Sequence, residues 1–169
     1  MSGKIDLSIN FRKSSKSVLV FILAIFFASQ SVSADKKIID NGIVSTNLCI
    51  DALLIALIGT KDVIAVSSVA GDPRYSLIAD EVKSLKKVKF NAEAIYALNP
   101  SLVLASNFSS PKTRLALTKL DVEVKMVNYA LSIKDVENNL LYLGELLGAS
   151  NKAAEIIKTI QATTHSSEN

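Results

Sequence analysis

Side chains that commonly carry enzymatic chemistry are scarce in this sequence. The single histidine, His165, lies in a polar C-terminal tail, and the single cysteine, Cys49, lies between two apolar residues. A Ser–His or Cys–His catalytic pair would have to recruit His165 from that tail. No basic residue stands beside Cys49 to activate its thiol, so Cys49 is expected to be a small, buried and inert residue. We therefore predict no catalytic residue.

The motifs of nucleotide, phosphate and nucleophile sites are also missing. The sequence contains no G-x-G-x-x-G, no G-x-x-x-x-G-K-[ST] and no G-x-S-x-G. One histidine and one cysteine do not make a tetrahedral zinc site, and neither a metal site nor a cofactor is predicted. Asp80–Glu81 and the pair of Asp121 and Glu123 lie among lysines, as expected of a solvated surface. This residue content favours a binding protein over an enzyme.

Polar, turn-rich segments follow four predicted strands. The strands are Gly42–Ser45, Val63–Ser67, Leu102–Ala105 and Val122–Val127, and the segments after them are Thr46–Asn47, Ser67–Tyr75, Ser106–Ser110 and Asn128–Ala130. Helices are predicted over residues 48–58, 76–85, 91–98, 111–120, 132–147 and 151–163. The lysine-rich segment Lys86–Lys89 is interpreted as a solvated turn.

This order of elements predicts an α/β fold with three layers. Strands that are apolar throughout and separated by helices indicate a mostly parallel sheet that is covered on both faces. In such sheets, ligands bind beyond the carboxyl ends of the strands. The four polar segments therefore predict a ligand-binding edge.

The first 34 residues have the three parts of a secretory signal. Basic residues precede an unbroken apolar run from Val18 to Phe27, and Val32-Ser33-Ala34 is a small-residue cleavage pattern. The run has about half of the ~20 apolar residues that a membrane span requires. We expect cleavage after Ala34 and no membrane insertion of the mature protein. Because no cysteine follows the run, we expect a periplasmic protein that is not a lipoprotein.

The net charge of +3 belongs to this signal. Residues 1–34 contain Lys4, Arg12, Lys13 and Lys16 but a single acidic residue, Asp6, so the remainder of the chain is formally neutral. A basic surface for nucleic acid is not predicted, and no nucleic-acid partner is expected.

Four segments of the chain have a familiar order and spacing. They are Ile43–Asp51 with the Leu/Ala-rich helix after it, Val63–Ser68 with Asp72–Pro73, Asn91–Leu104, and Ser132–Gly148. In Asn91–Leu104, a glutamate, a short apolar helix, a proline and an apolar strand follow one another. This arrangement resembles the cobalamin and ferric-siderophore solute-binding proteins of bacterial ABC importers. Ser101 and Lys86–Lys89 depart from the pattern of that family.

The resemblance implies the N-terminal lobe of a protein whose two α/β lobes are joined by one long helix and hold the ligand between them. Residues 35–150 would form the lobe, and residues 151–169 would form the start of the interlobe helix and a frayed tail. The second lobe is absent from the sequence. The chain is therefore expected to be a fragment, a truncated product or the partner of a separate second lobe. An envelope enzyme or assembly factor with the same half-fold, or a non-functional fragment, remain alternatives.

The resemblance also implies partners and a ligand class. A periplasmic substrate-binding component works with an inner-membrane ABC permease. The scarcity of histidine favours a metal that is already chelated, as in cobalamin, a ferric siderophore or haem, over a bare ion. Glu93 is implied to dock against arginines of the permease. Its alternative role is a local one, in which its charge suits the N-terminal end of its helix.

The candidate ligand-binding residues lie in the polar segments of the predicted edge. They are Asn47, Ser68, Arg74, Tyr75, Asn107, Phe108 and Tyr129. Arg74 could pair with a carboxylate or phosphate of a ligand, and the rings of Phe108 and Tyr129 could pack on a flat ring. Arg74 could instead be a turn residue, the two aromatic residues could cover the sheet edge, and Asn47 could cap the first helix.

Overall fold

A five-stranded parallel sheet forms the centre of the protein, in a computed structural model that describes residues 40–166. The strands are β1 (Ile43–Ser45), β2 (Val63–Ser67), β3 (Lys86–Val88), β4 (Leu102–Ser106) and β5 (Val124–Val127). Their order in the sheet is β3-β2-β1-β4-β5, and each neighbouring pair is parallel. The predicted α/β class is confirmed.

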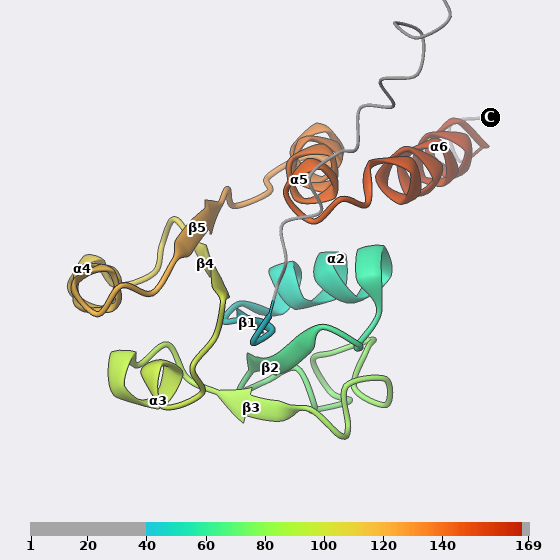
Figure 1. Ribbon diagram of the computed structural model, residues 1–169. Coiled ribbons are helices and arrows are strands. Elements are labelled where there is room, and N and C mark those ends of the chain that lie inside the picture. The colour runs from blue at the N-terminus through green and yellow to red at the C-terminus, as the bar shows by residue number, and fades with distance from the viewer. Residues whose placement is uncertain (1–39, 167–169) are drawn as a thin grey trace, which may run out of the picture. The chain divides into compact units, whose positions relative to one another are not determined.

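Helices cover both faces of this sheet (Figure 1). One face carries α2 (Leu48–Ile58), α5 (Ile133–Leu146) and α6 (Ser150–Ser166). The other face carries α3 (Ala92–Tyr96) and α4 (Pro111–Lys119). The three predicted layers are therefore present. None of the helices among residues 40–166 is both long enough and apolar enough to cross a membrane.

Successive strand residues contribute to two separate hydrophobic cores. Ile43, Leu102 and Leu104 belong to the core under α2, α5 and α6, whereas Val44 and Val103 belong to the core under α3 and α4. Because both faces are buried, the strands read as continuous apolar runs without polar alternation. The apolar runs in the sequence were therefore sufficient to predict a doubly covered sheet.

Four side chains cap helices at the positions where the sequence predicted helix starts. The side chain of Asn47 accepts hydrogen bonds from the first turn of α2, and that of Asn91 accepts one from the amide of Ala94 in α3. Ser110 and Ser132 cap α4 and α5 in the same way. These bonds satisfy amide groups that have no partner within the helix.

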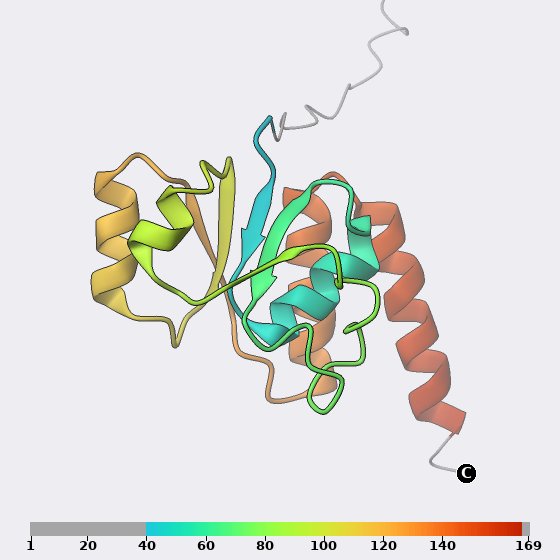
Figure 2. The ribbon, with the colours of Figure 1, turned by 90° about the horizontal axis from the view of Figure 1, so that it is seen from below.

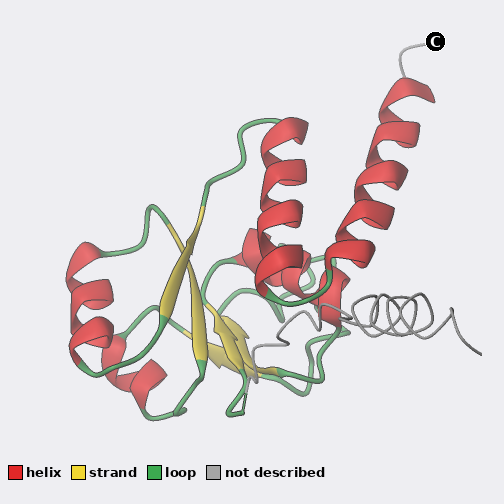
Figure 3. Ribbon diagram, turned by 45° about the horizontal axis from the view of Figure 1, so that its top comes forward, coloured by secondary structure: helices red, strands yellow, loops and turns green. Residues whose placement is uncertain are grey.

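Helices α5 and α6 lie side by side (Figure 3). They approach each other closely at two small residues, Gly144 and Ala153. A Cβ atom on Gly144 would lie 2.7 Å from the Cβ of Ala153, so only glycine allows this approach. Farther along, the Gln161 amide donates to a carboxylate oxygen of Glu137 over 2.7 Å. These two contacts fix the direction of α6 relative to α5.

The segment before β3 differs from the prediction. Residues 76–85 form a series of turns rather than a helix, and Lys86–Val88 is a strand rather than a solvated turn. Val88 is buried and is paired with Ser67 of β2, which favours the strand. Lysines on an edge strand also discourage further strand pairing.

Cys49 also differs from the prediction, because it is exposed in the first turn of α2 rather than buried.

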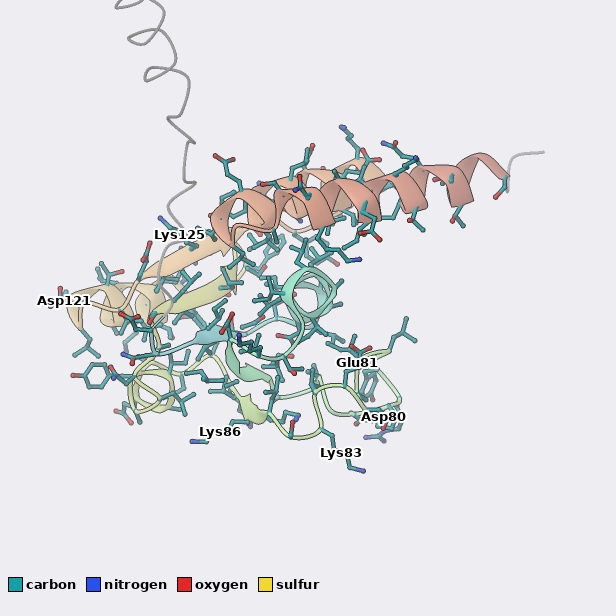
Figure 4. All side chains as sticks on the ribbon, turned by 45° about the vertical axis from the view of Figure 1, so that its right-hand side comes forward. Asp80, Glu81, Lys83, Lys86, Asp121 and Lys125 are labelled. Atoms are coloured by element: carbon teal, nitrogen blue, oxygen red, sulfur yellow. The ribbon has the colours of Figure 1, made fainter. Side chains whose placement is uncertain are left out.

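Of the acidic residues that were predicted to lie on solvated surfaces, Asp80, Glu81 and Asp121 are exposed, whereas Glu123 is half-buried. Figure 4 shows Lys83 and Lys86 pointing away from the protein, with Asp80 and Glu81 on the turns that precede β3. All four residues are exposed. At the opposite edge of the sheet, Lys125 of β5 forms an ion pair with Glu123 over 3.2 Å.

Candidate functional site

The carboxyl ends of the strands meet at one edge, where the connecting loops gather (Figure 2). In this view β1 and β2 point toward the bottom, and the segments after β1, β2, β4 and β5 all lie there. The seven candidate residues belong to these segments. Parallel strand topology thus brings parts of the chain that are distant in sequence to one edge. Whether they bind a ligand stays a prediction.

Phe108 and Tyr129 form an aromatic pair at this edge. Their ring centroids are 5.3 Å apart and their planes meet at 82°, which is an edge-to-face contact. Phe108 is 78% exposed and Tyr129 is 50% exposed. Asn107 links the two loops, because its side-chain oxygen accepts a hydrogen bond from the Tyr129 amide over 3.3 Å. The structure therefore brings three of the candidates into one cluster.

Arg74 and Tyr75 form a second cluster in the loop after β2. The Arg74 guanidinium donates to both carboxylate oxygens of Asp72, at 3.0 Å and 2.6 Å. It also lies 5.4 Å from the centre of the Tyr75 ring. The hydrogen bonds from Arg74 hold the pKa of Asp72 below its usual value. Arg74 is thus a turn residue, although its 76% exposed side chain keeps donors available.

Asn47 and Ser68 differ in environment, because the Asn47 side chain already accepts hydrogen bonds within the protein and Ser68 is exposed. The side-chain oxygen of Asn47 accepts from the amides of Cys49 and Ile50, at 3.0 Å and 3.4 Å. Its capping role is therefore present in the structure. Ser68 is exposed immediately after β2. Glu93 is exposed in the first turn of α3, two residues after the cap residue Asn91.

Several apolar side chains near this edge were not among the predicted site residues. The exposed members are Val69, Leu77, Leu131 and Ile133. They lie in or directly after the loops that follow β2 and β5. An apolar residue inside a polar, turn-rich segment was the signal that could have found them, because burial in a core does not explain it.

A buried carboxylate beneath the edge was also not predicted. Asp51 is fully buried, and its carboxylate accepts hydrogen bonds from the Ser67 hydroxyl at 2.5 Å and from the Ser67 amide at 3.2 Å. The Ser45 hydroxyl also faces it without a well-formed hydrogen bond. Burial raises the pKa of Asp51, and the serine hydroxyls and the charge of Lys87 partly oppose that rise. An acidic residue inside the apolar stretch LCIDALLIALI was the available signal.

Within residues 40–166, no three His, Cys, Asp or Glu side chains converge to form a site for a metal ion. The donors at the edge are instead amide, hydroxyl and guanidinium groups beside aromatic rings. Such groups recognise an organic ligand by packing and hydrogen bonding rather than by coordination to a metal.

Comparison with known proteins gives consistent results. The family described as periplasmic binding protein matches residues 43–169. The "Probable siderophore-binding lipoprotein YfiY" of Bacillus subtilis is 32% identical over 76% of this chain and 38% of its own length. The "Uncharacterized ABC transporter substrate-binding lipoprotein YvrC" of the same organism is 33% identical over 48% of this chain and 28% of its own length. The chain thus spans well under half of the length of these relatives.

Solved structures share the fold. A periplasmic heme-binding protein from Pseudomonas aeruginosa superimposes with a TM-score of 0.62 at 21% identity. The match covers 72% of this chain and 43% of that protein. At this level of identity the likeness establishes the fold, and the coverage corresponds to a single lobe.

One expectation from the sequence is wrong. The missing cysteine after Val18–Phe27 predicted that the protein is not a lipoprotein, but both relatives from Bacillus subtilis are named as lipoproteins. The prediction depended entirely on the N-terminal segment, which lies outside the described residues.

Both the sequence and the fold connect this chain to one family. The family match covers most of the chain, a relative shares 32% identity over 76% of it, and the three-layer parallel fold superimposes on one lobe of solved binding proteins. This chain belongs to the periplasmic binding protein family.

Proposed function

We propose that the protein is the substrate-binding component of an ABC importer for a metal chelate. The ligand would be a ferric siderophore, haem or cobalamin, and it would lie on the carboxyl edge of the sheet. The candidate residues there, Asn47, Ser68, Arg74, Tyr75, Asn107, Phe108 and Tyr129, would contact it. The observation that carries the proposal is the exposed pair of Phe108 and Tyr129, which Asn107 holds together.

The chemistry of the edge supports this ligand class. Exposed aromatic rings offer large apolar faces with little conformational entropy to lose, which suits a flat or rigid chelate. Arg74 carries a charge that could pair with a carboxylate of the ligand. The names of the relatives, a siderophore-binding lipoprotein and a heme-binding protein, agree with this class.

The proposal includes a second surface for the ligand and a membrane partner. Pockets commonly enclose about 70–90% of a ligand, and one edge of a sheet covers a single side. A second lobe, whichever chain supplies it, would cover the other side. An ABC permease would receive the ligand on the outer side of the cytoplasmic membrane, with Glu93 as a docking residue. The protein would have no catalytic activity.

Calorimetric titration of the full chain with ferrichrome, haemin and cyanocobalamin tests the proposal. We expect at least one chelate to bind, and Phe108→Ala to weaken its affinity about fivefold or more, a loss of about 1 kcal/mol. Leu115→Ala, which removes an exposed apolar side chain from α4, is the matched control and should leave the affinity unchanged. The absence of binding by all three chelates at about 1 mM would overturn the proposal.

A further inference from the structure

The loop after β2 carries three of the seven candidate residues but has no regular secondary structure. Its own hydrogen bonds are local turns, in which the amide of Ala70 donates to Ser67, that of Asp72 to Val69, and that of Ser76 to Asp72. Such turns set the shape of a loop without fixing its position on the sheet. Contacts with other elements must therefore hold Ser68, Arg74 and Tyr75 in place.

Asp51 fixes the start of this loop. It lies in the first turn of α2 and reaches Ser67, the last residue of β2. One carboxylate oxygen accepts from the Ser67 hydroxyl and both accept from the Ser67 amide. Hydrogen bonds to an ionised acceptor are stronger than those between neutral groups. These hydrogen bonds tie the point at which the loop leaves the sheet to helix α2.

Lys87 contacts the middle of this loop and the turns that follow it. Its side chain passes under Gly71 so closely that a Cβ atom there would lie 2.6 Å from the Lys87 Cε. Its ammonium group donates to the carbonyl oxygens of Val82 and Leu85, at 2.5 Å and 2.7 Å. The charge of Lys87 also attracts the carboxylate of Asp51. Asp51 therefore contacts the start of the loop, and Lys87 contacts its middle at Gly71.

We infer that Asp51 is a positioning residue of the ligand site, which acts through Ser67 to hold the loop of residues 68–76 in its binding geometry. It is fully buried and therefore acts without touching the ligand. The part of this inference that concerns ligand affinity rests on the proposed function. The part that concerns the loop does not, because the loop is held in the free protein.

Amide hydrogen exchange of the full, ligand-free chain tests the loop. Asp51→Asn keeps the size of the side chain but removes its charge and half of its acceptor capacity. We expect about tenfold faster exchange across residues 68–76 in this variant, and unchanged exchange in α5. Glu137→Gln is the matched control, since it also removes a buried, hydrogen-bonded carboxylate, but one that connects α5 to α6 far from this loop in sequence. Exchange within about twofold of the parent in Asp51→Asn would overturn the inference.

A second variant covers the case in which Asp51→Asn does not fold. Ser67→Ala removes the hydroxyl donor and keeps the amide donor, so residues 68–76 should exchange about threefold faster. Unchanged exchange in this variant, with Asp51→Asn unfolded, would also overturn the inference.

Affinity for ferrichrome, haemin and cyanocobalamin completes the test. We expect Asp51→Asn to weaken binding of the preferred chelate about threefold or more, with Glu137→Gln equal to the parent. Faster loop exchange with unchanged affinity would show that this loop is not part of the site. If the parent binds none of the three chelates, the proposed function fails, and the exchange result still decides whether Asp51 holds the loop.

Discussion

The ring of Phe108 meets the ring of Tyr129 edge to face, with centroids 5.3 Å apart, although the two residues follow different strands. The contact joins the loop after β4 to the loop after β5. Asn107 adds a hydrogen bond between the same loops. The two loops therefore form one structural unit at the edge of the sheet.

The first prediction concerns the energy of this unit. A double-mutant cycle with Phe108→Ala and Tyr129→Ala should give a coupling energy of about 0.5 kcal/mol, because edge-to-face pairs contribute ~0.5–1.5 kcal/mol and these rings are largely exposed. Urea unfolding of the four proteins measures the coupling. Leu115→Ala combined with Tyr129→Ala should be additive. Additivity in the Phe108–Tyr129 cycle would contradict the prediction.

The second prediction concerns acid stability and Glu137. Hydrogen bonds from Gln161 and Lys134 hold the pKa of Glu137 below its usual value, against the effect of desolvation. A carboxylate with a lowered pKa binds protons less well in the folded state. It therefore stabilises the fold above its unfolded pKa of about 4.3, and this stabilisation is lost as the pH falls through the folded pKa.

Glu137→Gln should consequently be less stable than the parent near neutral pH, with the difference closing as the pH falls below about 4.3. Urea unfolding at a series of pH values measures this. Glu145→Gln, which removes an exposed carboxylate from the same helix, is the control for the loss of one negative charge from α5. A constant difference between Glu137→Gln and the parent across this range would exclude the linkage.

The third prediction concerns Asp51, for which the sign is opposite. Burial raises the pKa of Asp51, so the folded protein binds this proton more tightly than the unfolded chain does. The contribution of Asp51 to the unfolding free energy therefore falls as the pH rises from about 3.9 through the folded pKa. Asp51→Asn should become more stable relative to the parent over this rise in pH, as measured by urea unfolding. A relative stability that moves the other way would be inconsistent with net desolvation.

The fourth prediction separates two roles of Glu93. If Glu93 only interacts with the N-terminal end of α3, Glu93→Gln should cost about 0.3–1 kcal/mol of stability and leave transport unchanged. If it pairs with permease arginines, Glu93→Gln and Glu93→Arg should fold nearly normally but weaken association by about 2–5 kcal/mol. We expect the second result.

The assay uses a two-lobed version of the protein with its cognate permease in proteoliposomes. Glu145→Gln is again the control, because this carboxylate is exposed on α5. If both Glu93 variants associate with the permease as the parent does, the docking role is excluded and Glu93 acts only at the end of its helix.

The fold was largely predictable because its signals are local. Asn47, Asn91, Ser110 and Ser132 each stand directly before the helix that they cap, and the buried strands are continuous apolar runs. Residues 76–85 were mistaken for a helix because Ile78, Val82 and Leu85 have helical spacing. The structure uses these side chains to cover the core from a series of turns. Strand β3 forms by pairing with β2, and no pattern within Lys86–Val88 itself indicates that pairing.

The site was predictable only in part. The residues that follow strands could be chosen from the sequence, because parallel topology places all carboxyl ends at one edge. The contact between Asp51 and Ser67 joins a helix to the end of a neighbouring strand, and the geometry of that pair exists only after the sheet has formed. The exposed Leu77 and Leu131 were missed because apolar residues in a sequence are first assigned to a core.

The close contact between Gly144 of α5 and Ala153 of α6 sets the angle between the two helices. Helix α6 has 17 residues, which corresponds to a length of about 25 Å. A tilt of about 10° at this contact would displace the far end by about 4 Å. Gly144 of α5 meets Ala153 near the start of α6, and the hydrogen bond between Glu137 and Gln161 joins the two helices farther along. A larger side chain at position 144 would therefore push the start of α6 away from α5 and strain the hydrogen bond between Glu137 and Gln161.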